Sequence, residues 1–151
     1  MQIFIKGNVP SSKNSKVATK NGVFMSKTVR KYLQSLGVKN YSVGKKTVEN
    51  YKTRPNLFTQ AITPMFNDPM ESPHVIGLYF IRDSRRKFDF LNVAQVVCDL
   101  LVAHRVFVDD NMDCVIPMAF RAGPGFSQIW KVPVDSWYCV DKARPGVVID
   151  F

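Results

Sequence analysis

RRKFDFLNVAQVVCDLL, residues 85–101, runs from three cations through an aspartate between two phenylalanines into a largely apolar segment. The apolar side chains of this segment recur with helical spacing: Val93, Val96, Val97, Leu100 and Leu101. This spacing predicts a helix from Asn92 to about His104 with one buried face. Asp89 stands just before that helix, where an aspartate can cap the first turn.

The segments on both sides of this stretch predict strands. HVIGLYFIR, residues 74–82, is almost wholly apolar over a strand length, so we expect a buried central strand. VFVDDN, residues 106–111, predicts a short strand that ends at acids. DCVIPMAF, residues 113–120, predicts a further strand. The centre of the chain therefore has the order strand, helix, strand.

The two ends of the chain add short elements. The opening MQIFIK and the closing GVVIDF predict strands, and Asn21-Gly22 predicts a hairpin turn. Ser26 is expected to cap a helix over 27–36, and Pro55 to open another over 56–66. Residues 121–145 predict loop with one or two short strands. The sequence thus predicts one α+β domain, residues 1–151, with a single mixed β-sheet and about three helices packed on it.

Charge is unevenly distributed along the chain. Residues 1–54 hold 12 lysines and arginines against one acid, a net charge of +11, whereas residues 55–151 hold 9 bases and 11 acids, a net of −2. Such asymmetry is typical of a protein with a polyanionic partner. A solvated surface that keeps the protein in solution explains it equally well at this stage.

Other features narrow the class of protein. The opening residues lack the pattern of a signal peptide, and no window suits a transmembrane helix, so we expect no membrane association. The three cysteines form no CxxC pair, which argues against a zinc site and favours reduced thiols in the cytoplasm. His74 and His104 belong to no catalytic motif. We expect no small-molecule cofactor.

Acidic and amide side chains form two groups around the predicted helix. Asp89, Asn92, Gln95 and Asp99 are spaced 3, 3 and 4 residues apart, which predicts one polar stripe. Asp109 and Asp110 form an adjacent pair that repels itself unless water or a cation intervenes. The plainer alternative is a solvated stripe, a helix cap and an acidic loop. Hard oxygen ligands would select Mg²⁺, or Mn²⁺, with substrate phosphate completing the shell.

Together these residues resemble a known family. Phe88-Asp89-Phe90-Leu91-Asn92, Asp99-Leu100-Leu101 and Val108-Asp109-Asp110 resemble the RusA family of Holliday junction resolvases, especially its phage-borne branches. The likeness is clear over about residues 75–120. It is weaker at the opening IFIKGNVPSSKN and the closing Pro145-Gly146-Val147-Val148-Ile149.

The resemblance implies a RusA-like fold and a homodimer that nicks branched DNA in symmetric strands with Mg²⁺, in a bacterial cytoplasm and encoded by a phage. It implies metal ligation by Asp89 and Asp110, with Asp109 as a further ligand, and supporting catalytic roles for Asp99, Asn92 and Gln95. DNA contacts would then come from the basic side chains of the first third and of the segment before Asp89: Lys13, Lys16, Lys27, Arg30, Lys31, Arg82, Arg85, Arg86 and Lys87.

Two positions depart from the family pattern. Leu91 stands where the family has a second aspartate, and Gln95 stands where it has a lysine. The resemblance implies that the aspartate binds metal and that the lysine lies near the scissile phosphate. Arg85, Arg86 or Lys87 would be able to supply the missing positive charge. The alternative function is a module that binds branched or single-stranded DNA without cutting it, and an RNA nuclease remains a third reading.

Overall fold

The computed structural model describes residues 1–12, 16–36, 70, 73–104 and 106–151. The helix predicted over 56–66 and the residue Lys13 lie outside the described residues. The predicted α+β fold with one mixed sheet and three packed helices is confirmed within the described residues. A separate two-stranded hairpin accompanies the sheet.

The main sheet is built around β4 (His74–Arg82). One side of β4 pairs antiparallel with β7 (Gly146–Asp150), which in turn pairs antiparallel with β1 (Gln2–Lys6). On the other side, the first half of β4 pairs in parallel with β5 (Val115–Ala119), and its last residues pair in parallel with β6 (Tyr138–Val140). The prediction of β4 as a buried central strand is therefore confirmed.

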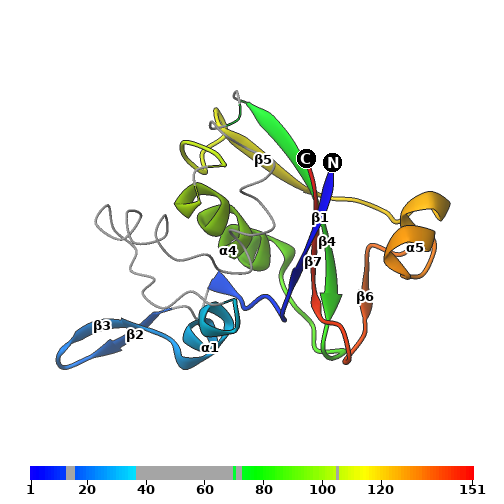
Figure 1. Cartoon of the computed structure of the whole chain (residues 1–151). Coiled ribbons are helices and arrows are strands. Elements are labelled where there is room, and N and C mark those ends of the chain that lie inside the picture. Colours follow the sequence, from blue (N-terminus) through cyan, green and yellow to red (C-terminus); the bar gives the residue numbers. More distant parts are fainter. Residues whose placement is uncertain (13–15, 37–69, 71–72, 105) are drawn as a thin grey trace.

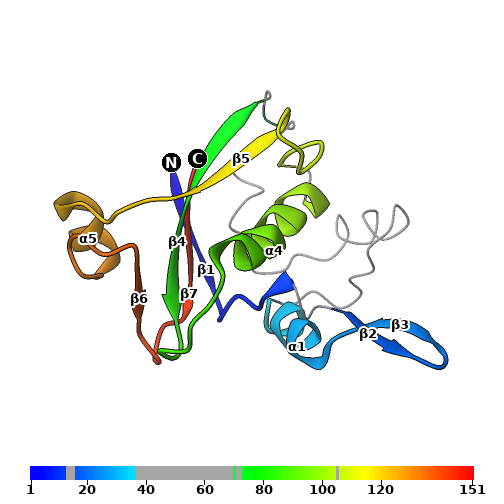
Figure 2. The same cartoon turned by 180° about the vertical axis from the view of Figure 1, so that it is seen from behind.

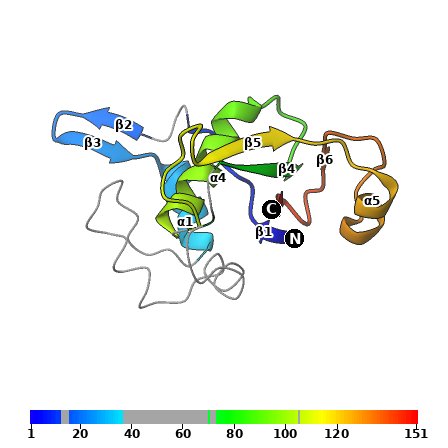
Figure 3. The ribbon, with the colours of Figure 1, turned by 90° about the horizontal axis from the view of Figure 1, so that it is seen from above.

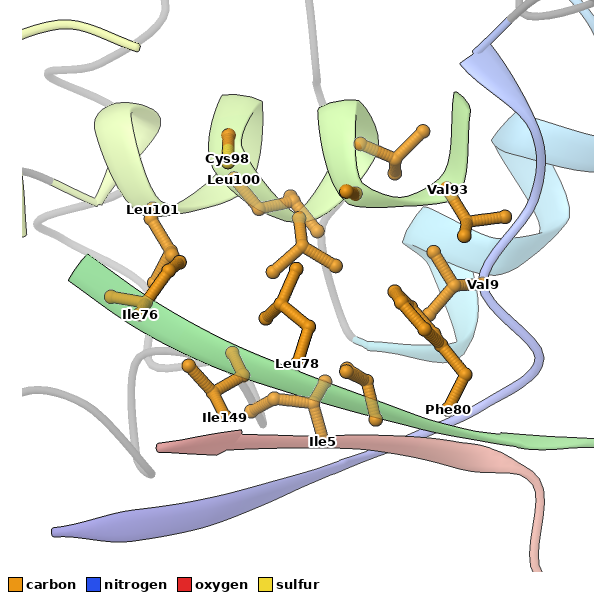
Figure 4. Packing of buried hydrophobic residues seen from close by; sticks show 14 of the residues in the cluster. Ile5, Val9, Ile76, Leu78, Phe80, Val93, Cys98, Leu100, Leu101 and Ile149 are labelled. Atoms are coloured by element: carbon orange, nitrogen blue, oxygen red, sulfur yellow. The ribbon is translucent and has the colours of Figure 1, made fainter. Parts of the chain in front are cut away.

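Helix α4 (Phe90–Ala103) lies across one face of this sheet (Figure 1). Figure 4 shows its apolar side meeting alternate residues of β4, because side chains of a strand point to one face at every second position. The buried side chains that meet there include Ile76, Leu78, Phe80, Val93, Leu100 and Leu101. This core fixes α4 on the sheet, and the polar flank of the helix faces outward.

Helix α5 (Pro124–Trp130) covers part of the other face of the sheet (Figure 2). Phe126 and Trp130 pack there against a smaller buried cluster around Tyr79, Ile81 and Val148. Trp130 Nε1 donates a hydrogen bond of 2.8 Å to Gln2 Oε1. The sequence pattern predicted loop in this region, and α5 corrects that prediction. Its seven residues are too few for helical periodicity to show.

The basic first third contributes a hairpin and a helix. Strands β2 (Lys16–Thr19) and β3 (Gly22–Met25) pair antiparallel, which confirms the predicted hairpin. Its turn residues are Lys20 and Asn21, one position before the predicted Asn21-Gly22. Helix α1 (Lys27–Ser35) follows, and Val29 N donates to the Oγ of its predicted cap Ser26. Figures 1 and 3 show the hairpin extending away from the main sheet (Figure 3).

The opening loop joins β1 to the centre of the domain. Gly7 has φ of 117°, a conformation that suits glycine, and Gly7 N donates to Pro145 O at 2.8 Å. Val9 is buried, and Val9 O accepts a hydrogen bond of 2.7 Å from Arg82 Nη1. Residues 7–12 therefore pack beside the end of β4 and the start of α4.

The predicted strand over 106–111 is absent: residues 106–111 form bends and loop. Val106 and Phe107 are buried like strand residues, but their backbone does not join the sheet. Val106 N donates to Leu101 O at 2.9 Å, and Val106 O accepts from Met70 N at 2.8 Å. The segment after α4 is therefore tied to the helix end, and β5 begins only at Val115.

Candidate functional site

Asp89 occupies the N-cap of α4. Its Oδ1 accepts a hydrogen bond of 3.0 Å from Leu91 N, which satisfies one of the free amides of the first turn. The side chain is exposed. The capping role that the sequence analysis gave as the plainer alternative is therefore present.

Three of the predicted site residues meet on the outer flank of α4. Gln95 Nε2 donates to Asp99 Oδ1 at 2.8 Å and to Asp110 Oδ2 at 2.5 Å. Gln95 and Asp99 lie one helical turn apart, so they share a face of the helix. Asp110 comes from the loop that follows α4. We call Gln95, Asp99 and Asp110 the acidic cluster.

The loop that carries Asp110 is organised by Asp109. Asp109 Oδ1 accepts from Asp110 N at 2.9 Å, and its Oδ2 accepts from Asn111 Nδ2 at 2.8 Å. Asn111 Oδ1 in turn accepts from Asp113 N at 3.0 Å. Both carboxylate oxygens of Asp109 thus accept hydrogen bonds from the loop. Through these bonds Asp109 positions its neighbour Asp110.

Asn92 lies between Asp89 and the acidic cluster on the polar flank of α4. Ser12 Oγ donates to Asn92 Oδ1 at 3.5 Å, a long hydrogen bond. This contact brings the end of the opening loop, which belongs to the family resemblance, beside the start of α4. The predicted DNA contact Lys13 follows Ser12 in sequence and lies outside the described residues.

Asp89 stands apart from the acidic cluster along the helix axis. At 1.5 Å per residue, Gln95 lies about 9 Å and Asp99 about 15 Å along the helix from Asp89. The short strand predicted over 106–111, which would have ended at Asp109 and Asp110, is absent. The loop that carries these two acids meets the helix at Gln95 instead.

The acidic cluster also affects the core beneath it. Burial, and then the carboxylates of Asp110 and Asp99, raise the pKa of the Cys98 thiol to about 12. Cys98 is buried. The thiol therefore remains protonated and is a packing group, as the sequence predicted for a core cysteine. Through their hydrogen bonds to Gln95, both carboxylates lie over the same short length of α4.

The chemistry of the acidic cluster suits a hard cation. Carboxylate and amide oxygens are ligands of the Mg²⁺ and Mn²⁺ type. The Gln95 amide lies between the Asp99 and Asp110 carboxylates, and a turn of that amide would replace its nitrogen with Oε1 as a third oxygen donor. Within the described residues no three His, Cys, Asp or Glu side chains group as metal ligands. The fit therefore depends on Gln95 and on oxygens from substrate or water.

The segment before Asp89 is basic and exposed. Arg85, Arg86 and Lys87 are all exposed between β4 and α4. Arg82 differs: its guanidinium donates to Val9 O and lies 4.7 Å above the Phe88 ring centroid. Partial burial lowers the pKa of Arg82. Arg82 thus fastens the opening loop to the sheet, whereas the three residues after it are available to a polyanion.

The described cations of the first third lie on β1, β2, the hairpin turn and α1. Lys20, Lys27, Arg30 and Lys31 are exposed, while Val29 and Leu33 on the same helix are buried. Helix α1 therefore has an exposed basic side and a buried apolar side. Lys16 lies in β2.

The first departure from the family pattern lies on the surface. Leu91 is 71% exposed in the first turn of α4. An apolar side chain there contributes little to the core, so the position tolerates an acid without burying it. The second departure, Gln95, holds the acidic cluster together through its amide hydrogens.

The two histidines lie away from these groups. His104 Nδ1 is 2.7 Å from Leu100 O at the C-terminal end of α4, and burial lowers the pKa of His104. His74 begins β4, and its ring lies 6.1 Å from that of Phe107. Both contacts are with structural neighbours.

Comparison with known proteins adds no relative. No protein-family model matches the chain, and no curated protein is similar to it. Among the described residues, no helix is both long enough and apolar enough to cross a membrane.

Proposed function

We propose that this protein is a metal-dependent endodeoxyribonuclease of the RusA type that resolves Holliday junctions or other branched DNA by paired nicks. The observation that carries the proposal is the hydrogen bonding of Gln95 to both Asp99 and Asp110. It joins two carboxylates, 11 positions apart, that the family resemblance had selected from sequence alone. A chance resemblance would not require them to meet.

The residues divide the work as follows. Asp110 and Asp99, with the Gln95 oxygen, would hold a divalent cation, and Asp89 would hold substrate or a cation at the start of the same helix flank. A bound Mg²⁺ or Mn²⁺ supplies activation of water and charge stabilisation at the phosphate. Asp109 positions Asp110 through the loop, and Asn92 orders the opening loop against α4.

Contacts with the DNA backbone would come from cations in two parts of the domain. Arg85, Arg86 and Lys87 adjoin Asp89, and the exposed side of α1 carries Lys27, Arg30 and Lys31. Contacts of this kind fix the position of a DNA backbone but do not read its sequence. Paired nicks on a two-fold symmetric junction require two copies of the site, so we propose a homodimer.

Leu91 favours a second candidate function. Where the family has a metal-binding aspartate, this chain exposes an apolar side chain. A protein with one ligand fewer can keep the grip on DNA and lose the chemistry. The second candidate is therefore a module that binds branched or single-stranded DNA without cleaving it.

One experiment separates these functions. A labelled four-way junction, a linear duplex and a single strand of matched length are incubated with the protein in Mg²⁺, Mn²⁺ or EDTA. A resolvase gives symmetric nicks in the junction that require metal. The binding module shifts the junction on a native gel in every buffer and leaves it intact. Cleavage of a matched RNA in preference to DNA would contradict both.

A further inference from the structure

An exposed aromatic side chain lies at the edge of the sheet next to the basic segment. Tyr138 begins β6 and is 47% exposed. β6 pairs with the last residues of β4, so Tyr138 lies opposite Phe80 at the strand end from which the basic segment leaves. Trp137, the residue before it, is 57% exposed. Neither residue was singled out by the sequence.

The ring of Tyr138 is held in a fixed orientation. Its centroid lies 5.0 Å from that of Phe88, and the two rings are at 84°. Phe88 also packs against Phe80, 6.1 Å away, which is part of the main core. The Arg82 guanidinium covers Phe88. An exposed ring that is already fixed by packing against core side chains loses little conformational entropy when a planar ligand stacks on it.

The charge around this ring is positive. Residues 82–87 hold four cations and one acid, and residues 121–145 hold four cations and two acids. Both acids of the second segment face arginines: Asp135 lies 3.4 Å from Arg121, and Asp141 lies 3.7 Å from Arg144. Asp83 is therefore the one acid of these two segments that is left to offset the exposed Arg85, Arg86 and Lys87, and the three cations outnumber it. The surface combines a planar apolar ring with cations.

We propose that Tyr138, with Arg85, Arg86 and Lys87, forms a binding site for unpaired nucleotides, in which the ring stacks on a base and the cations hold its phosphates. Stacking on aromatic rings and a basic track are the features by which proteins bind single strands. An acidic peptide would use the cations and leave the ring without a planar partner. The inference deepens the proposed function, since a branched DNA offers unpaired bases at its crossing point.

The test measures binding in EDTA, where no cleavage occurs. The probes are a fluorescein-labelled oligothymidylate and a duplex of equal length, followed by fluorescence anisotropy. Tyr138→Leu should weaken single-strand binding about tenfold and leave duplex binding within about twofold. Tyr138→Phe should bind as the wild type does, because the ring remains. Met118→Leu, at a 53% exposed position on β5, is the matched control and should have no effect.

Tryptophan emission gives an independent readout. The chain has two tryptophans. Trp130, the last residue of α5, is partly buried and donates to Gln2, whereas Trp137 is exposed and precedes Tyr138. Single-strand binding should therefore quench the wild-type emission. Trp137→Phe should bind equally well with the quenching lost. Arg86→Ala should weaken binding to both probes, which supports the phosphate half of the site if Tyr138→Leu fails to fold.

The outcomes distinguish this site from the proposed nuclease. Unchanged single-strand affinity in a folded Tyr138→Leu protein, or equal loss for single strand and duplex, would overturn the stacking site. So would Tyr138-dependent competition by a polyglutamate peptide. Junction cleavage in Mg²⁺ that is normal in Tyr138→Leu would then leave the proposed function intact. Junction cleavage absent from the wild type, with single-strand stacking present, would remove the nuclease and keep the site.

Discussion

The two ends of α4 carry opposite chemistry. At its N-terminal end lie Asp89, the basic segment 85–87 and the Phe88–Tyr138 ring pair. About 15 Å further along the helix lies Asp99, which belongs to the acidic cluster. Gln95 and Asp110 of this cluster are exposed, and hydrogen bonds hold its three residues together. One end is built to attract a polyanion, and the other repels it unless a cation is bound.

The difference between the two ends indicates how they would act together on a nucleic acid. A carboxylate cluster can act on a phosphate only if something else brings the phosphate close. Cations at the far end of the same rigid helix can do so without neutralising the carboxylates. Variants at the acidic end should therefore change the chemistry, and variants at the basic end should change the affinity.

The largest effect is expected at the acidic end. Asp110→Asn should lower the rate of metal-dependent junction cleavage by at least about 100-fold. Loss of a residue that only hydrogen-bonds a metal ligand already lowers metal affinity or activity by about 10- to 100-fold, and loss of a ligand should cost more. Junction affinity in EDTA should stay equal or rise slightly, because a negative charge near phosphate is removed. Cleavage on denaturing gels and binding on native gels measure the two.

Asp113→Asn is the matched control for that variant. It removes an equal charge from the same exposed loop, and the contact of Asp113 with Asn111 is made by its backbone amide, which the variant keeps. Its cleavage rate should stay within about threefold of the wild type. Asp89→Asn and Asp99→Asn variants measured in parallel show which of these two carboxylates is needed, like Asp110, for metal-dependent cleavage. Full cleavage by the Asp89→Asn and Asp110→Asn single variants would remove this site assignment.

Restoring the family aspartate should raise activity by about tenfold. Leu91→Asp adds a carboxylate to the first turn of α4 and leaves the Gln95 oxygen available to the cation. Because Leu91 is 71% exposed, the acid is not buried, and the cost in unfolding free energy should be about 0.5 kcal/mol or less at that position. A folded Leu91→Asp variant without any gain would mean that this chain's chemistry does not use that position.

At the basic end, the expected effect is a change in salt dependence. Affinity for DNA should fall linearly with salt on logarithmic axes, with a slope of about −0.9 per phosphate contact. Arg85→Ala with Arg86→Ala should flatten that slope by about two units, and Lys27→Ala with Lys31→Ala should do the same if α1 also lies on the DNA. The larger of the two changes locates the DNA path, and unchanged slopes in both would move it elsewhere.

The smallest effect is expected from His104, at the C-terminal end of α4. Burial lowers its pKa in the folded protein below the ordinary 6.5, so the unfolded chain binds the proton more readily. His104 therefore has no effect on the pH dependence of stability above about pH 6.5, where its ring is uncharged in both states. The free energy of unfolding falls as the pH drops below that value, because the unfolded chain then takes up the proton first. His104→Gln should flatten this dependence in urea unfolding measured from pH 7.5 down to 5.5. An unchanged pH slope would contradict it.

Long periodic segments were predictable from sequence because burial leaves a regular pattern. β4 was predicted over its observed range, and α4 and α1 within about two residues, including the cap Ser26. The polar stripe on α4 was predictable for the same reason. Val106 and Phe107 misled the prediction, since buried apolar residues look alike in a strand and in a packed loop.

The arrangement of the site was only partly predictable. Gln95 and Asp99 follow from helical spacing, but the approach of Asp110 depends on how a loop turns back along α4. The pairing of Phe88 with Tyr138 joins positions 50 residues apart through two short stretches of sheet, and no local pattern signals it. Contacts of that kind are set by tertiary packing.

The central claim is that Asp99, Asp110 and the Gln95 oxygen hold a divalent cation. Its most direct test is a titration of the protein with Mn²⁺, with free Mn²⁺ followed by electron paramagnetic resonance and cleavage not involved. The wild type and Asp113→Asn should remove Mn²⁺ from the free signal at the same concentration. Asp110→Asn and Asp99→Asn should each require at least about tenfold more protein. Equal Mn²⁺ binding by all four proteins would contradict the account.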